Sequence, residues 1–383
     1  MLRQAQPLDA LLAQFISRGI NSVAVLLLDV LRIGAYQLRF LDRVPPHAAV
    51  ATTVALARES VNNRAAGFAN AVLRRVSGMP RPAAGDAAPA GVPLQGAASH
   101  PDWLVARWRT RFGDDATNAL LQWNNTQPSL VLQATRGTTG ELESMLRAQG
   151  IAATPAPHGA GVIVTESRPE RLPGYDDGAF FVQDTAQALV VHFAAFPADA
   201  IVYDACTAPG GKLLGLSRRT RHVIAADRSR VRLRRVTENV ARAGRGTEHL
   251  IVADASHPPV RPVLAYLLDA PCLGTGSFAR HPDARLRVTM AALEQLAAAQ
   301  GVLLDAAAER IALGGLLCYA TCSLEPEENE TQVNAFLRRH PDFRRLPPAG
   351  FPAELLTQDG DLLTLPQRDR IDGAFAARLV RAS

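Results

Sequence analysis

Residues 200–212 read Ala-Ile-Val-Tyr-Asp-Ala-Cys-Thr-Ala-Pro-Gly-Gly-Lys. The first six residues predict a buried strand, the Pro-Gly-Gly run predicts a turn, and a helix is expected to follow. Two glycines between a strand and a helix let the backbone approach a ligand, and the helix start offers free N–H groups to an anion. The stretch is not a P-loop, because Cys206 stands where that motif needs Gly and Leu213 where it needs Ser or Thr.

Lys212, which ends this stretch, is the single lysine in a chain with forty arginines. The guanidinium of Arg is planar and stays protonated, whereas the ammonium of Lys is a compact donor whose pKa changes with its surroundings. A position that keeps Lys where every other long basic side chain is Arg is therefore predicted to need an ammonium. The alternative is a lysine that survived by chance.

Strands and helices alternate from about residue 181 onward. Strands are expected at 200–205, 222–227, 249–254, 264–270 and 315–320, with an Arg-rich helix ending near 243 and a long helix at 289–313. This order predicts an α/β fold, with a parallel sheet covered by helices on both faces. Ligands of such sheets bind at the carboxyl ends of the strands.

The preceding part of the chain is organised differently. Residues 1–78 predict helices at 23–40, 48–60 and 65–76, residues 79–98 predict a Pro- and Gly-rich linker, and residues 99–180 predict a small α+β region. That region has expected strands at 130–134 and 161–165, an expected helix at 141–149, and three tryptophans predicted to be core residues. Residues 181–383 form the predicted α/β domain.

Positive charge is concentrated in two regions. The net charge is +5 over the whole chain, +5 within residues 1–78 and +8 within residues 201–245, which leaves −8 for the remainder. Two basic regions indicate a polyanion contacted at two places, although solvated helix faces are the alternative. In the Arg-rich helix, Val231, Leu233 and Val236 are expected to take the buried face, so only some of its arginines can contact such a partner.

The four cysteines, at 206, 272, 318 and 322, contain no CxxC pair. Neither a disulfide framework nor a zinc site is expected, and no metal is predicted. No apolar run reaches membrane-spanning length, and no signal peptide is expected before the first helix. These features predict a reduced, cytoplasmic protein without a membrane partner.

Acidic residues end the second and third predicted strands. Asp227 lies about fifteen residues after the Gly-Gly turn, where an acid can bind ribose hydroxyls, and Asp254 could accept a hydrogen bond from an exocyclic amine. Together with the turn they predict a pocket for an adenosine-bearing cofactor. Each Asp alone could instead cap a helix N-terminus.

Cysteines follow the fourth and fifth strands. The fourth ends in Asp269-Ala270-Pro271-Cys272 and the fifth in Thr321-Cys322-Ser323, so both thiols are expected at one site, where a thiolate is favoured. Cys318 is expected to be core. A thiolate beside an adenosine pocket indicates methylation at carbon 5 of a pyrimidine: attack on carbon 6 makes carbon 5 nucleophilic toward S-adenosylmethionine. Asp269 could donate a proton near N3, and Lys212 could orient the base or hold Asp269.

These motifs resemble those of the RNA cytosine-C5 methyltransferases. The resemblance covers about residues 180–380 and rests on Phe181–Asp184, Asp204–Lys212, Asp227–Gly244, Leu267–Cys272, Arg280–Asp283 and Thr321–Asn329. It implies a Rossmann-like class I methyltransferase core. Three further stretches, 31–38, 45–50 and 69–75, look like the NusB-type RNA-binding helical domain. The combination is similar to bacterial enzymes that methylate one cytidine of 16S ribosomal RNA.

The resemblance implies roles for individual residues. Cys322 would be the nucleophile and Cys272 would assist product release, with Asp269 and Lys212 in the catalytic group. In DNA cytosine methyltransferases the Pro-Cys cysteine is the nucleophile, so this assignment separates the two classes. The S-adenosylmethionine site would be lined by Cys206, Thr207, Ala208, Pro209, Gly210, Gly211, Lys212, Asp227, Asp254 and Asp269.

The implied partner is 16S ribosomal RNA, naked or in a small-subunit assembly intermediate, methylated by a monomer that does not bind DNA. Two alternatives remain open. The same chemistry could act on transfer RNA. From another class, the chain could be a non-catalytic RNA-binding or assembly factor built on a decayed methyltransferase, although its intact Cys322, Cys272, Asp269 and Lys212 argue against decay.

Overall fold

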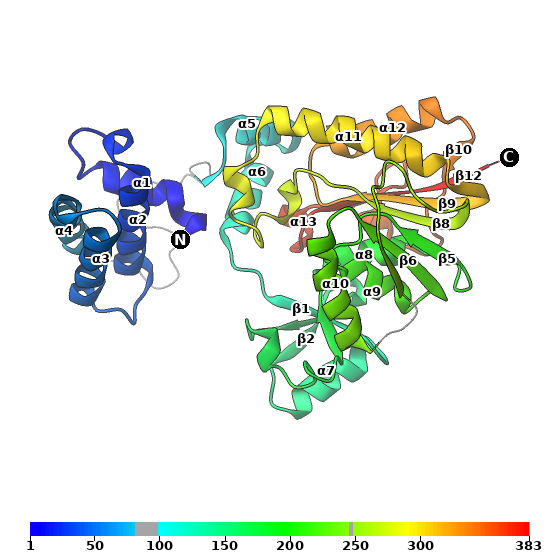
Figure 1. Cartoon of the computed structure of the whole chain (residues 1–383), viewed down its shortest axis with the longest axis horizontal. Helices are drawn as coiled ribbons and strands as arrows, with labels where there is room; N and C mark the ends of the chain where they lie inside the picture. The colour runs from blue at the N-terminus through cyan, green and yellow to red at the C-terminus, as the bar shows by residue number, and fades with distance from the viewer. Residues whose placement is uncertain (81–98, 245–247, 383) are drawn as a thin grey trace. The chain divides into compact units, whose positions relative to one another are not determined.

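The computed structural model describes residues 1–80, 99–244 and 248–382, so the predicted linker lies almost wholly outside the described residues. The chain divides into two compact units, Met1–Thr126 and Gln127–Ser383 (Figure 1). No helix within the described ranges is both long enough and apolar enough to cross a membrane.

The first unit is helical. Its helices are α1 (Ala5–Ala13), α2 (Val25–Phe40), α3 (Pro46–Ser60), α4 (Asn63–Ser77), α5 (Asp102–Phe112) and α6 (Asp114–Asn125). The three helices predicted before residue 78 are confirmed as α2, α3 and α4, whereas α1 was not predicted.

Close packing and one ion pair hold α1 to α4 together. Gly34 on α2 allows the close approach, because a Cβ there would lie 2.8 Å from side-chain carbons of Thr53 on α3 and Leu73 on α4. Arg32 binds Asp9 on α1 through two hydrogen bonds of 2.6 and 2.7 Å. Of the three tryptophans predicted to be core, Trp108 is buried, while Trp103 and Trp123 are only partly buried.

A small antiparallel sheet opens the second unit. It comprises β1 (Leu130–Ala134), β2 (Ala153–Pro155), β3 (Val162–Val164) and β4 (Phe180–Val182), in the order β2-β3-β1-β4. Helix α7 (Thr139–Ala148) packs its buried Leu142 and Leu146 against this sheet and begins with a capping box between Thr138 and Glu141. The predicted α+β character of this region is confirmed.

The second sheet has eight strands and carries the predicted α/β pattern. Its strands are β5 (Ile201–Asp204), β6 (His222–Asp227), β7 (Glu248–Val252), β8 (Val263–Asp269), β9 (Ile311–Thr321), β10 (Phe343–Arg345), β11 (Leu362–Thr364) and β12 (Ala374–Arg381). The order is β10-β12-β9-β8-β5-β6-β7, with β11 paired to β12. Strands β5 to β9 are parallel, as predicted.

The sheet as a whole is mixed, because three further strands that were not predicted pair antiparallel in it. Strand β12 runs antiparallel to β9 from Phe375↔Thr321 to Val380↔Leu316, and β10 and β11 also pair with it antiparallel. Strand β12 follows β11 through a connection that contains only the short helix α13 (Pro366–Asp369). This connection is too short for the crossover that a parallel pair requires, so these two strands pair antiparallel.

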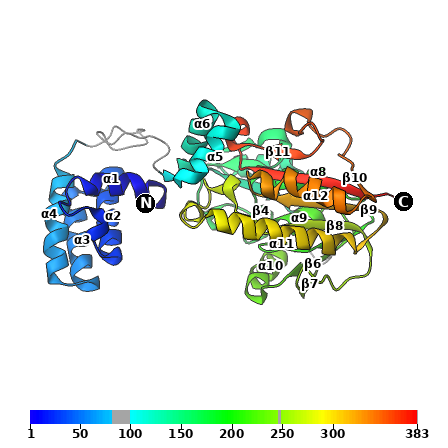
Figure 2. The same ribbon diagram turned by 90° about the horizontal axis from the view of Figure 1, so that it is seen from above.

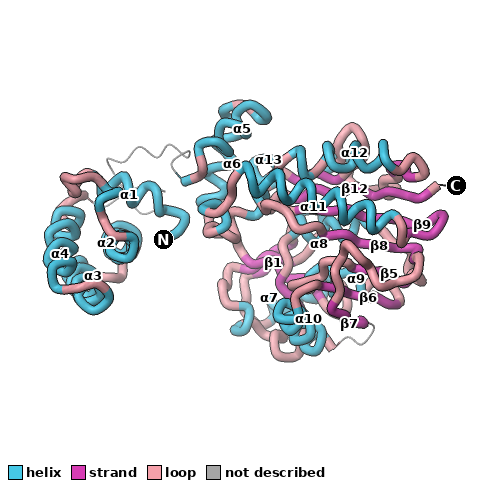
Figure 3. The backbone as a smooth tube through the Cα atoms, turned by 45° about the horizontal axis from the view of Figure 1, so that its top comes forward, coloured by secondary structure: helices cyan, strands magenta, loops and turns pink. Residues whose placement is uncertain are grey.

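Helices cover both faces of this sheet, as Figures 1, 2 and 3 show. One face packs against α8 (Thr185–Ala194), α9 (Gly211–Ser217) and α10 (Arg230–Ala243). The other packs against α11 (Met290–Ala308) and α12 (Glu330–Arg339). The strands buried between these layers explain the near-continuous apolar runs in their sequences.

Two local predictions are wrong. The helix expected at 289–313 ends at Ala308, because Ile311 is fully buried and begins β9 in register with Val263. Val231 was expected to be buried on α10 but is 72% exposed, since Leu233 and Val236 alone supply the inward face of that part of the helix.

Candidate active site

The carboxyl ends of β5 and β8 lie at the point where the strand order reverses. Strands β6 and β7 follow β5 on one side, and β8 and β9 lie on the other. Such a switch point leaves a crevice in which open α/β sheets bind ligands. Asp204 ends β5 and Asp269 ends β8, so both carboxylates lie at this crevice.

The loop after β5 is held by backbone and side-chain bonds from neighbouring elements. Thr207 N donates to Ala226 O of β6 at 2.9 Å. From α10, Arg232 Nη2 donates to Ala208 O at 2.6 Å and Asn239 Nδ2 to Pro209 O at 3.2 Å. Gly210, at φ 101°, adopts a left-handed conformation that favours glycine. The loop from Cys206 to Lys212 is thus a fixed wall of the crevice.

Asp227 and Asp254 occupy the predicted side of this crevice, with different burial. Asp227 ends β6, is buried, and accepts from Ser229 N at 2.8 Å. Asp254 lies two residues beyond β7, is exposed, and accepts from Ser256 N and Oγ. Ser229, not Asp227, caps α10. Each carboxylate therefore closes a local turn with one oxygen, and neither caps a helix.

Asp204 is wholly buried beneath the loop, and no hydrogen bond of standard geometry reaches either of its carboxylate oxygens. Burial raises the pKa of Asp204 to about 7; the nearby Thr207 hydroxyl opposes this rise, and the Asp269 carboxylate adds to it. Burial also raises the pKa of Cys206 to about 12, so this thiol stays protonated. The carboxylates of Asp204, Asp227 and Asp269 make this end of the crevice acidic.

Lys212 reaches from the start of α9 to the end of β8. Its Nζ donates to Asp269 Oδ2 at 2.7 Å and to Gln187 Oε1 on α8. The side chain is only 10% exposed. Burial alone would lower the pKa of Lys212, but the Asp269 carboxylate outweighs it and the net pKa is raised. The structure thus brings together Lys212 and Asp269 as predicted, while Gln187 was not predicted to take part.

The two strand-end cysteines converge. Cys272 Sγ lies 3.4 Å from Cys322 Sγ, and Cys322 N donates to Cys272 Sγ at 3.3 Å. The hydrogen bond from Cys272 lowers the pKa of Cys322; burial and Asp269 oppose this, and Lys212 adds to it. The same bond, with burial, raises the pKa of Cys272 well above its usual range. Cys318 is buried in the core, as predicted.

A buried carboxylate positions the Cys272 loop. Leu273 N donates to both oxygens of Glu328, at 2.9 and 3.2 Å. Gln300 of α11 donates to Glu328 Oε1 at 3.0 Å and to Pro271 O at 2.8 Å. Sequence reasoning missed both residues, although Glu328 lies within the Thr321–Asn329 motif.

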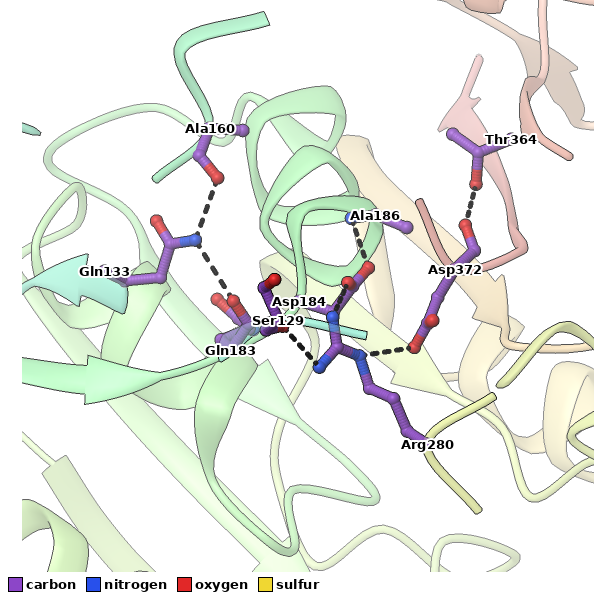
Figure 4. Close-up of polar contacts among 9 residues, drawn as sticks. All are labelled: Ser129, Gln133, Ala160, Gln183, Asp184, Ala186, Arg280, Thr364 and Asp372. Atoms are coloured by element: carbon purple, nitrogen blue, oxygen red, sulfur yellow. Dashed lines mark hydrogen bonds and ion pairs between the residues drawn. The ribbon is translucent and has the colours of Figure 1, made fainter. Parts of the chain in front are cut away.

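Arg280 joins three segments that are distant in the sequence (Figure 4). Its guanidinium donates to Asp184 Oδ2 at 2.6 Å, to Asp372 Oδ2 at 3.1 Å and to Ser129 O at 3.2 Å. Asp184 in turn caps α8 through Ala186 N. Gly373, next to Asp372, donates to Gly276 O, and Gly276 donates to Cys322 O at 2.9 Å. Arg280 and Asp184 lie within the Arg280–Asp283 and Phe181–Asp184 motifs, so the sequence indicated both residues. Nothing in the sequence indicated Asp372.

Three family models match successive parts of the chain. They are the NusB family over residues 1–78, the ferredoxin-like domain of RsmF/B-like methyltransferases over residues 100–169, and the 16S rRNA methyltransferase RsmB/F over residues 193–380. The ribosomal RNA small subunit methyltransferase B of Vibrio cholerae is 33% identical over 389 residues, which cover 99% of this chain and 87% of that protein. The probable enzyme of Synechocystis is 31% identical over 399 residues, covering 100% and 89%.

Solved structures share the fold. The protein PH0851 superposes with a TM-score of 0.84 at 21% identity, covering 99% of this chain and 87% of that one. NSun6 from Pyrococcus horikoshii, solved with SFG, gives a TM-score of 0.66 at 18% identity, covering 74% and 98%.

The helical first part, the small sheet and the strand-end crevice together define a methyltransferase of the Rossmann-like α/β class. Within that class, the chain belongs to the ribosomal RNA small subunit methyltransferase B family. This membership confirms the predicted family and fold class. It also confirms that the protein is a methyltransferase whose class of substrate is ribosomal RNA.

Proposed function

We propose that the chain transfers a methyl group from S-adenosylmethionine to carbon 5 of one cytidine in 16S ribosomal RNA, through a covalent bond between Cys322 and carbon 6. The observation that carries this proposal is the meeting of two thiols, 3.4 Å apart, at the carboxyl ends of β8 and β9, close to Lys212 and Asp269. A thiolate on Cys322 beside a protonated Cys272 supports a nucleophile at 322.

The crevice residues fit the cofactor. S-adenosylmethionine carries a cationic sulfonium and an adenosine, and would supply an electrophilic methyl group. The acidic cluster of Asp204, Asp227 and Asp269 suits that cation, and Asp227 and Asp254 offer carboxylate acceptors at successive strand ends. The loop from Cys206 to Lys212, whose backbone α10 fixes, would hold the remainder.

In this mechanism the protein residues act on the base. Cys322 sulfur forms a bond to carbon 6, which makes carbon 5 nucleophilic enough to take the methyl group. Water then takes the proton from carbon 5, the electron pair of that C–H bond re-forms the carbon 5–carbon 6 double bond, and the sulfur–carbon 6 bond breaks to return the Cys322 thiolate. Lys212 holds Asp269 toward the edge of the base, and Cys272, protonated and in contact with Cys322, assists the release of the product.

The other parts of the chain have roles in the same proposal. Residues 1–78 and 99–180 would bind RNA, residues 79–98 would link them, and residues 181–383 would carry the methyl transfer. The enzyme would act as a monomer in the cytoplasm, where ribosomal RNA is found, and would not act on DNA.

Trapping of the covalent adduct tests the cysteine roles. Cys272→Ala incubated with 16S ribosomal RNA and S-adenosylmethionine should accumulate a protein–RNA adduct that survives denaturing electrophoresis. Cys322→Ala should form none, and Cys318→Ala, which changes a core cysteine, should behave as wild type. An adduct with Cys322→Ala and none with Cys272→Ala would reverse the two roles.

Methylation mapping tests the substrate. Bisulfite sequencing of a strain that lacks the gene should show one missing 5-methylcytosine in 16S ribosomal RNA. A methyl group missing from transfer RNA instead would assign the chemistry to that substrate. Calorimetry showing no S-adenosylmethionine binding would favour a non-catalytic RNA-binding factor.

A further inference from the structure

A second cavity lies in the same unit, between the small sheet and helices α8 and α9. It has a volume of about 420 Å³ and is lined by Thr138 at the start of α7, His192 on α8, and Arg218 and Arg219 after α9, among others. Its lining includes none of Lys212, Asp269, Cys272 and Cys322. The cavity is therefore distinct from the cysteine site.

The lining of this cavity is cationic. Its charge comes from Arg218 and Arg219, because the lining includes no aspartate or glutamate and its histidine is neutral near pH 7. The nearby Glu141 is already engaged at the rim, where it accepts from Thr138 N at 2.6 Å and from Thr138 Oγ1 at 3.1 Å. Positive charge without a matching carboxylate favours an anion from solution.

The two arginines differ in what they bind. Arg218 donates to Ala134 O and, at 2.6 Å, to Gly137 O, so it fixes the loop after β1. The Arg219 guanidinium makes no hydrogen bond or ion pair with any residue in the described part of the chain. It therefore has all five of its N–H donors available to a ligand.

Arg218 and Arg219 are exposed and His192 is half-buried, and the three lie close enough to interact electrostatically. Burial lowers the pKa of Arg219, and no acidic neighbour opposes this effect. Burial, with Arg219 and Arg218, lowers the pKa of His192 to about 4. A bound anion would relieve both shifts, because an opposite charge favours the protonated form of each side chain.

We propose that this cavity binds a phosphate group, with Arg219 as its principal donor and His192 as a further contact. A guanidinium presents paired N–H groups that match two phosphate oxygens. The phosphate can come from the backbone of the RNA substrate or from free inorganic phosphate. The RNA source rests on the proposed function, whereas binding of free phosphate does not.

Titration of the full-length protein with inorganic phosphate tests the site directly. Calorimetry should detect binding, and NMR should show the pKa of His192 rising when phosphate is bound. Arg219→Gln should weaken phosphate binding by about 10-fold or more, the loss of a charge-assisted hydrogen-bonding pair. Arg221→Gln removes the same charge from an exposed position two residues away and should leave the affinity unchanged.

Binding of a 16S ribosomal RNA fragment then separates the two sources. If the ligand is an RNA phosphate, Arg219→Gln should weaken RNA binding and reduce the slope of log affinity against log salt by about one. Unchanged RNA binding with weakened phosphate binding would assign the site to free phosphate. Equal phosphate affinity in the wild type and Arg219→Gln, or no change at His192, would overturn the proposal. These readouts need no methyl transfer, so they stand or fall apart from the proposed reaction.

Discussion

Lys212 is the single lysine in a chain with forty arginines, and its side chain makes contacts at this site that an arginine could not make. Its ammonium lies within a buried position and reaches Asp269 and Gln187 with two hydrogen bonds. An Arg side chain has the charge but is longer and planar, so its fork cannot occupy the same point between α8 and β8. Compositional accident is therefore the weaker explanation for the single lysine.

We accordingly expect Lys212→Arg to lose at least about 100-fold in kcat, or about 2.7 kcal/mol of transition-state stabilisation. Its free energy of unfolding should change little, because the positive charge beside Asp269 is kept. Steady-state methylation assays and urea unfolding provide the measurements, with Arg235→Lys on the exposed face of α10 as the control. Near-normal turnover of the Lys212→Arg variant would show that catalysis does not need an ammonium at this position.

Asp204 should make stability depend on pH. Its pKa is raised from 3.8 to about 7 by burial, so between these values the unfolded chain releases a proton that the folded chain keeps. The free energy of unfolding should therefore fall as pH rises from about 4 to about 7, and the loss should persist above that range. Asp204→Asn removes the effect, worth about 4 kcal/mol at pH 8 relative to pH 4.

Urea unfolding followed by the infrared absorption of β-sheet measures this change. Tryptophan fluorescence is unsuitable, because Trp103, Trp108 and Trp123 all lie in the first unit. The exposed Asp199→Asn is the matched control. A difference between wild type and Asp204→Asn that stays constant from pH 4 to pH 8 would contradict the argument.

At the scale of elements, helix α10 holds the loop between β5 and α9 through hydrogen bonds, in addition to presenting arginines that a polyanion could contact. Arg232 was predicted as one of several arginines available for phosphate contacts, yet it donates to Ala208 O and lies 3.4 Å from Asp227. Its neighbours Arg234 and Arg235 are exposed. The same helix thus donates a hydrogen bond that holds the β5–α9 loop and carries exposed arginines on its outer face.

Arg232→Ala should consequently raise the dissociation constant for S-adenosylmethionine by about 10-fold, since one charge-assisted hydrogen bond to the loop is lost. Arg234→Ala removes the same side chain from the outer face and should leave this affinity unchanged. Isothermal titration calorimetry of both variants is the measurement. Equal affinity in the two variants would show that the loop holds its shape without Arg232.

The same scale shows what the sequence could predict. Local patterns located β1 and β6 to the residue, and placed Asp227, Asp269, Cys272 and Cys322 at strand ends. No strand was predicted after residue 320, so β12 was missed; its pairing with β9 joins segments far apart in the chain, which no local pattern specifies. The partners that hold the site, such as Glu328 and Asp372, come from distant segments, and no local pattern specifies their contacts.

At the scale of the whole molecule, the chain carries two basic regions on separate compact units. Residues 1–78 belong to the first unit and residues 201–245 to the second. In the first, Arg58 and Arg64 are exposed; in the second, Arg234 and Arg235 are. A polyanion contacted through both regions would release counterions from each, and affinity would fall steeply with salt.

The two regions should therefore contribute independently to RNA binding. Replacing Arg58 and Arg64 by Gln, or Arg234 and Arg235 by Gln, should each lower the slope of log affinity against log salt by up to about two. The combined variant should lose the sum of both, because the sites lie in different units and share no partner. Filter binding of 16S ribosomal RNA from 50 to 200 mM salt measures the slopes. A slope that changes with only one pair would confine RNA contact to that unit, and leave the other basic region as a solvated helix face.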